Sequence, residues 1–106
     1  MELMLNSGGE GLRDYELVVI ISPEVAEEEI PANLEKISQF IVERGGSITE
    51  VNQWGKRKLA YPIKNFMEGN YVLTHFKMEP RLTADLEASL GLSGEILRHL
   101  LVRLSD

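Results

Sequence analysis

The chain contains no cysteine among its 106 residues. Disulfide bonds, zinc–thiolate sites and cysteine nucleophiles are therefore excluded. No apolar run approaches the roughly 20 residues that a membrane span needs. The first twelve residues also lack the basic stretch and the long apolar run of a secretory signal. These absences favour a cytoplasmic protein without a structural metal.

Groups that could form a catalytic site are also scarce. The only two histidines, His75 and His99, lie on separate predicted strands, and neither has a second histidine or a carboxylate at the spacing of a metal site. We interpret both as strand side chains at the surface of a sheet. The glycines never form a phosphate-binding loop followed by a lysine. We therefore expect no catalysis, no cofactor and no small-molecule substrate.

Positive charge is in deficit overall, because 11 Lys and Arg residues are set against 17 Asp and Glu residues, for a net charge of −6. The distribution is uneven. Residues 1–52 hold 3 basic and 11 acidic side chains, whereas residues 53–106 hold 8 basic and 6 acidic ones. Between Gln53 and Met67 there are four basic residues and no acid. Since salt screens charges over about 8 Å, an acidic protein can still present one basic surface to nucleic acid.

Hydrophobic spacing predicts six elements after a flexible leader at residues 1–12, which is rich in glycine and small polar residues. Apolar residues at steps of three and four indicate the helices, and alternation indicates the strands. In chain order we predict a strand at Tyr15–Ser22, a helix from Ile30 to Gly45-Gly46, an extended segment at Ser47–Ile63, a hairpin turn at Asn65–Asn70, a strand at Tyr71–Met78, a helix opened by Pro80 and closed by Gly91 and Gly94, and a strand at Ile96–Leu104.

This order, strand–helix–strand–strand–helix–strand, defines the expected fold class. Two such halves with right-handed crossovers produce a ferredoxin-like βαββαβ sandwich of the α+β class. The sheet would be four-stranded and antiparallel, with both helices on one face. We expect residues 13–106 to form this single domain.

The segment Trp54–Ile63 contains the densest functional signal. Three successive basic residues, Lys56, Arg57 and Lys58, stand beside a flat aromatic side chain. Cations of this kind bind phosphates, while Trp54 or Arg57 can stack on an exposed base of RNA. The alternative is a solvated edge strand whose lysines prevent aggregation. Composition alone does not decide between the two interpretations.

Five motifs in order resemble the bacterial small-subunit ribosomal protein six family, and the resemblance extends from Arg13 to Leu104. The motifs are Arg13-Asp14-Tyr15-Glu16, Gly45-Gly46, Trp54–Ile63, Glu68-Gly69-Asn70-Tyr71 and Leu97–Arg103. The resemblance implies a structural constituent of the small (30S) subunit of the cytoplasmic ribosome. It also implies binding to the central domain of the small-subunit (16S) ribosomal RNA, as a heterodimer with small-subunit ribosomal protein eighteen.

The resemblance also suggests which residues contact RNA: Arg13, Trp54, Lys56, Arg57, Lys58, Arg98 and Arg103. For Arg98, an ion pair with a neighbouring carboxylate is the alternative. Tyr61 is a further candidate for stacking, but we favour packing within the long hairpin for it.

Two other classes of protein share the predicted fold. An acylphosphatase-like hydrolase would need an anion-binding loop with an arginine after the first strand, where Ser22–Glu29 is acidic. A ligand-sensing module that dimerises through its sheet would need a glycine-bearing ligand loop, and it would leave Trp54–Ile63 unexplained.

Overall fold

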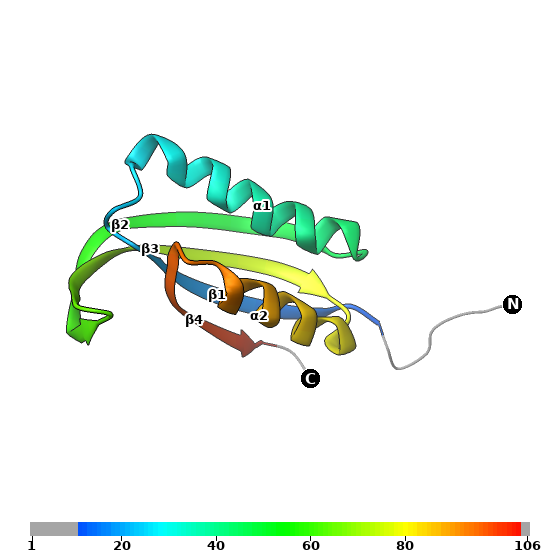
Figure 1. The fold of residues 1–106 in the computed structure, drawn as a ribbon. Coiled ribbons are helices and arrows are strands. Elements are labelled where there is room, and N and C mark those ends of the chain that lie inside the picture. The colour runs from blue at the N-terminus through cyan, green and yellow to red at the C-terminus, as the bar shows by residue number, and fades with distance from the viewer. Residues whose placement is uncertain (1–10, 105–106) are drawn as a thin grey trace, which may run out of the picture.

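A computed structural model describes residues 11–104 (Figure 1). The predicted leader lies outside the described residues except for Gly11 and Leu12. Short 3-10 turns at Glu27–Glu29 and Pro80–Leu82 precede the two helices. The main elements are β1 (Arg13–Ile21), α1 (Ile30–Glu43), β2 (Ser47–Ile63), β3 (Phe66–Met78), α2 (Thr83–Leu92) and β4 (Ile96–Arg103).

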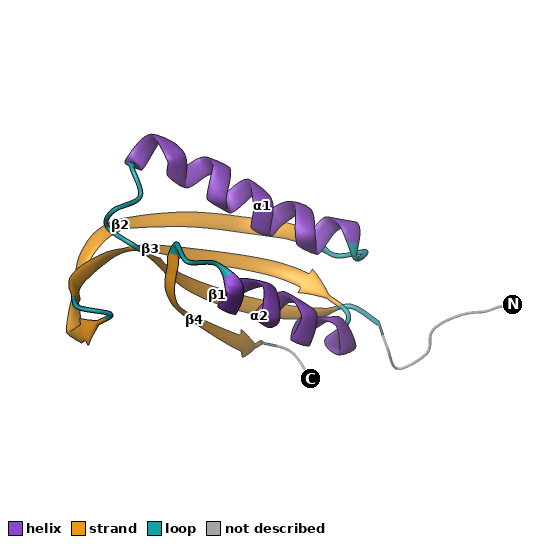
Figure 2. Ribbon diagram, viewed as in Figure 1, coloured by secondary structure: helices purple, strands orange, loops and turns teal. Residues whose placement is uncertain are grey.

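The four strands form one antiparallel sheet in the order β2-β3-β1-β4. Both helices cover the same face of this sheet (Figures 1 and 2). This architecture confirms the predicted ferredoxin-like fold of the α+β class. It leaves β2 and β4 as the two edge strands, and it leaves the second face, called the open face below, without helices.

The main core lies between the sheet and the helices. On β1, alternate residues point toward the helices, and Leu17 and Ile21 are fully buried. Ile41 of α1 and Leu86 of α2 pack onto these strand residues and are also buried. Burial of each such side chain contributes about 1.5–3 kcal/mol. The apolar spacings that predicted these elements therefore mark the residues that face this main core.

A proline fits the first turn of helix α1, and two glycines follow its end. Pro31 stands in the first turn, where its missing N–H is not needed. At the other end Gly45 adopts a φ of +84°, a conformation that glycine adopts without strain. A Cβ on Gly46 would clash with the backbone oxygen of Lys77 and the side chain of Ile41. The two glycines therefore bring the chain tightly from α1 into β2.

Two predicted boundaries were wrong. The hairpin turn is not at Asn65–Asn70: the chain reverses at Lys64 and Asn65, with φ values of 50° and 72°, and β3 already begins at Phe66. Two central residues with positive φ are typical of a type I′ turn, which suits the twist of a hairpin. The glycine that suggested a turn, Gly69, lies inside β3. Helix α2 likewise continues through Gly91 to Leu92.

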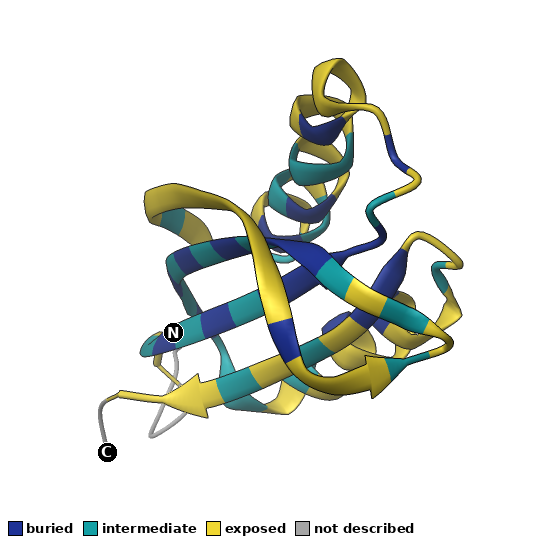
Figure 3. Ribbon diagram, turned by 90° about the vertical axis from the view of Figure 1, so that its left-hand side faces the viewer, coloured by how far each residue is buried: buried dark blue, intermediate teal, exposed yellow. Residues whose placement is uncertain are grey.

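The hairpin of β2 and β3 is longer than the sheet body, and its distal part curls over the open face. Leu59 of β2 is buried there against Ile20 of β1 and Leu97 of β4, in a second apolar cluster. Figure 3 shows the distal part of β2 crossing in front of the sheet toward β4. We call residues 56–66 the hairpin arm.

Candidate nucleic-acid interface

The three successive basic residues of the hairpin arm do not share one side. Lys56, Arg57 and Lys58 lie on β2, and side chains of a strand alternate between its two faces. Lys56 and Lys58 therefore point to one side and Arg57 to the other. The Nζ of Lys56 lies 4.0 Å from Oε1 of Glu68, an exposed pair that contributes about 0–1 kcal/mol. This weak pair leaves the cation available to a phosphate.

Arg57 lies on the side of Trp54. The register of β2 on β3 shifts between Gln53 and Gly55, where Gly55 has a φ of +85°. The shift lets Trp54 stack on Tyr71 of β3, with ring centroids 6.4 Å apart and an interplanar angle of 11°. The Arg57 guanidinium lies 5.6 Å from the centroid of the Trp54 ring. Trp54 is still 45% exposed, so an unpaired base could extend this stack.

Arg98 of β4 and Tyr61 of β2 contact each other. The Nη1 of Arg98 donates a hydrogen bond to the Tyr61 hydroxyl oxygen. Tyr61 is 56% exposed, so the interpretation that it packs inside the hairpin was wrong. The partner of Arg98 in this hydrogen bond is a phenol rather than the carboxylate that we considered.

Arg13 and Arg103 lie at the other end of the sheet. Arg13 is opposite Met78, and Arg103 is opposite Tyr15. The Arg13 guanidinium donates to the carbonyl oxygens of Gly11 and Leu12. Met78 lies nine residue steps along β3 from Gly69, the residue paired with Arg57 of the hairpin arm, which corresponds to about 30 Å. The seven predicted residues therefore do not form a single surface.

The two histidines have different surroundings. His75 stands on the open face in a row with Glu16 of β1 and Glu50 of β2, at 3.0 Å from Nε2 and 3.5 Å from Nδ1. The hydrogen bond to Glu16 has the largest effect on the pKa of His75 and raises it; burial opposes this, and the charges of Glu16 and Glu50 add to the rise, so the pKa lies above 6.5. His99 is a side chain of β4 that contacts Glu87 of α2 at 3.0 Å, so it lies on the helix-covered side of the sheet.

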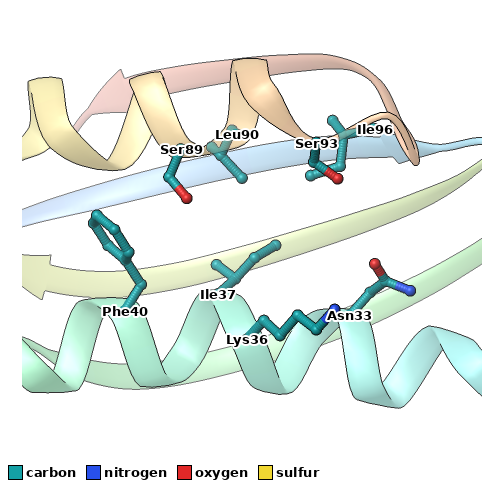
Figure 4. Close-up of a pocket in the computed structure, with 8 residues that line it drawn as sticks. All are labelled: Asn33, Lys36, Ile37, Phe40, Ser89, Leu90, Ser93 and Ile96. Carbon is teal, nitrogen blue, oxygen red and sulfur yellow. The ribbon is translucent and has the colours of Figure 1, made fainter.

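Two hollows lie outside the hairpin arm. One, of about 100 Å³, separates α1 from α2, and Lys36 is its one ionisable lining residue (Figure 4). The other, of about 190 Å³, lies beside Tyr71, Arg98 and Leu100 at the open face. Within residues 11–104, no group of three or more Asp, Glu or His side chains is arranged to hold a metal. No helix in the same range has the length and apolar content to cross a membrane.

Comparison with known proteins decides the family. The sequence model described as ribosomal protein S6 matches residues 14–103. The chain belongs to the ribosomal protein S6 family. The small ribosomal subunit protein bS6 of Dehalococcoides mccartyi is 45% identical over 103 residues, covering 97% of this chain and 94% of the relative. The bS6 of Caldanaerobacter subterraneus is 43% identical over 95 residues, covering 90% of this chain and all of that relative.

A solved structure agrees with the S6 assignment. The crystal structure of 30S ribosomal protein S6 from Thermotoga maritima superposes with a TM-score of 0.82 at 38% identity, covering 87% of each chain. The chain is accordingly a structural protein of the small subunit of the cytoplasmic ribosome. The match to the Dehalococcoides relative includes most of residues 1–12, since only three of the 106 residues remain outside it.

Two features of this candidate interface were not predicted from the sequence. Lys64 was counted among the basic residues but not as a candidate contact, because its place at the hairpin tip depends on where the chain reverses. Tyr71 was read only as a strand residue. Its stack on Trp54 depends on the register shift at Gly55, and the isolated glycine was the one signal of such a shift.

Proposed function

We propose that this chain binds the central domain of the small-subunit ribosomal RNA through its hairpin arm and Trp54, as a heterodimer with small-subunit ribosomal protein eighteen. The observation that carries the proposal is the hairpin itself. It extends beyond the sheet body and has four basic residues and no acid between Gln53 and Met67. Membership of the S6 family supplies the ribosomal setting.

The two sides of the arm suit different parts of an RNA. Lys56 and Lys58 point to the outer side, and Lys64 stands at the tip. Ammonium groups placed in this way contact phosphates and position the protein. On the other side, Trp54 offers an exposed ring already stacked on Tyr71, with Arg57 next to it. A splayed base stacks on such a ring without sequence-specific hydrogen bonds.

Arg13 and Arg103 make a second contact in this proposal. Because they lie at the far end of the sheet, they would bind a different phosphate from those at the hairpin arm. The role of all these residues is binding without catalysis.

The need for a protein partner follows from charge and from exposed apolar surface. With a net charge of −6, the chain offers RNA few attractive surfaces apart from its local basic ones. On and after the edge strand β4, Leu100, Val102 and Leu104 are 56%, 39% and 53% exposed. A row of exposed apolar side chains is typical of a protein interface. A basic partner docked there would cover this row and add phosphate contacts.

RNA binding measured with and without the partner tests the proposal. The logarithm of RNA affinity falls linearly with the logarithm of salt concentration. Lys56→Met combined with Lys58→Met should make this slope shallower by about 1.4–1.8, since each phosphate contact contributes about 0.7–0.9 to its magnitude. The matched control, Lys36→Met with Arg81→Met, removes the same charge from the helix side and should leave the slope unchanged. Equal slopes in the two variants would contradict the RNA contact. Tight and specific binding by this chain alone would contradict the need for the partner.

A further inference from the structure

Two edge strands that should be far apart touch each other. In the order β2-β3-β1-β4, three inter-strand spacings separate β2 from β4, which amounts to about 14 Å across a flat sheet. Nevertheless Tyr61 of β2 accepts a hydrogen bond from Arg98 of β4. The distal part of β2 must therefore lie over β3 and β1 on the open face, as Figure 3 shows.

An apolar contact accompanies this hydrogen bond. Leu59, two residues before Tyr61, is only 8% exposed and packs on Ile20 and Leu97. Gly69 of β3 permits the close approach, because a Cβ there would lie 2.5 Å from Cγ2 of Ile20. The hairpin arm is thus held by Leu59 near its middle and by Tyr61 nearer its tip.

Alternation along β2 places Arg98 beneath the arm. Leu59 faces the sheet, so Tyr61 and Arg57 face the same way, and Lys56 and Lys58 face outward. An RNA bound along the outer lysines would be separated from Arg98 by the arm. Arg98 is therefore poorly placed to bind the phosphates that Lys56 and Lys58 would contact.

We propose that Arg98 and Tyr61 are positioning residues that hold the hairpin arm across the open face and so fix the direction in which its outer cations point. Arg98 then acts on RNA through Tyr61 and not by touching a phosphate. The RNA part of this proposal rests on the proposed function. Its physical basis is preorganisation: an arm already held in place loses less conformational freedom on binding than a free one.

The free protein provides the first test, and it is independent of RNA. Tyr61→Phe and Arg98→Met each remove one partner of the hydrogen bond while keeping the ring or the aliphatic stem. Amide hydrogen exchange of residues 56–66 should become faster in both variants. Arg81→Met removes an equal charge from an exposed side chain on the helix side and should not alter exchange there. Unchanged exchange in both hairpin variants would overturn the proposal.

RNA binding in the presence of the partner provides the second test. Each single variant should weaken binding by about threefold to tenfold, the loss expected for one hydrogen bond. The double variant should be no weaker than either single one, because both remove the same contact. The salt slope should stay at the wild-type value, whereas a lost phosphate contact lowers it by about 0.7–0.9.

The opposite pattern would show that Arg98 contacts RNA directly. In that case Arg98→Met lowers the salt slope while Tyr61→Phe changes neither slope nor affinity. If the wild-type protein with its partner binds no RNA, the proposed function fails, yet the exchange measurement still decides whether Arg98 and Tyr61 hold the arm.

Discussion

Replacing Gly69 by alanine should destabilise the protein, although the same change usually stabilises a strand. A Cβ at this position would lie 2.5 Å from Cγ2 of Ile20 and 3.3 Å from the backbone oxygen of Ile21. Ile20 is β-branched and cannot easily move aside, so overpacking costs about 1–3 kcal/mol. Against this, alanine gains about 0.5–1 kcal/mol over glycine in a strand. We expect a net loss of about 1–2 kcal/mol in the free energy of unfolding.

Gly91→Ala is the matched control for this prediction. Gly91 lies inside α2, and no atom lies within 4 Å of the position that its Cβ would take. Alanine there should raise the free energy of unfolding by about 0.8–1 kcal/mol, the difference in helix propensity. Urea unfolding of both variants, analysed with a common slope, measures the two effects. If Gly69→Ala proves as stable as the wild type, the close approach of the hairpin to β1 is not a steric constraint.

Two further predictions concern the open face. Changing Glu16 and Glu50 to glutamine should lower the pKa of His75 toward 6.5, as an NMR titration would show, because both carboxylates raise it. Since this pKa is raised on folding, the stabilisation by His75 is present below pH 6.5 and is lost as the pH rises through the folded-state pKa. The stability difference between the wild type and His75→Gln should therefore shrink as the pH rises from below 6.5 through the folded-state pKa, and a constant difference would refute the assignment. Leu59→Ala should lower the free energy of unfolding by about 2 kcal/mol, as chemical denaturation would show. The control Leu92→Ala, at a residue 87% exposed, should change it by no more than about 0.5 kcal/mol. Equal losses in the two variants would argue against an arm packed on the sheet.

The fold could be predicted because the apolar spacing typical of a strand or a helix recurs several times within each element. Alternate apolar residues mark β1 from Tyr15 to Ile21, and steps of three and four mark α1. A single glycine is a weaker signal. Gly69 and Gly91 suggested a turn and a helix end, whereas one permits close packing and the other stands within a helix. Whether glycine breaks an element depends on the atoms that surround it, which the local sequence does not contain.

The candidate site could be predicted only as a segment. The sequence placed Lys56, Arg57 and Lys58 together, but their division between two sides of β2 follows from strand alternation once the register is known. The separation of Arg13 and Arg103 from the hairpin arm follows from strand pairing over long range. The contact of Arg98 with Tyr61 depends on the curl of the hairpin, a property of the whole sheet.

The turn at the hairpin tip shows a conflict between stability and charge. Lys64 has a φ of 50°, a left-handed conformation that is unfavourable for residues with a Cβ and that costs about 1–2 kcal/mol. Glycine or asparagine at this place would relieve the strain. Either would also remove the cation at the tip of the hairpin arm. The tip is therefore a position where selection for thermal stability alone and selection for assembly would choose different amino acids.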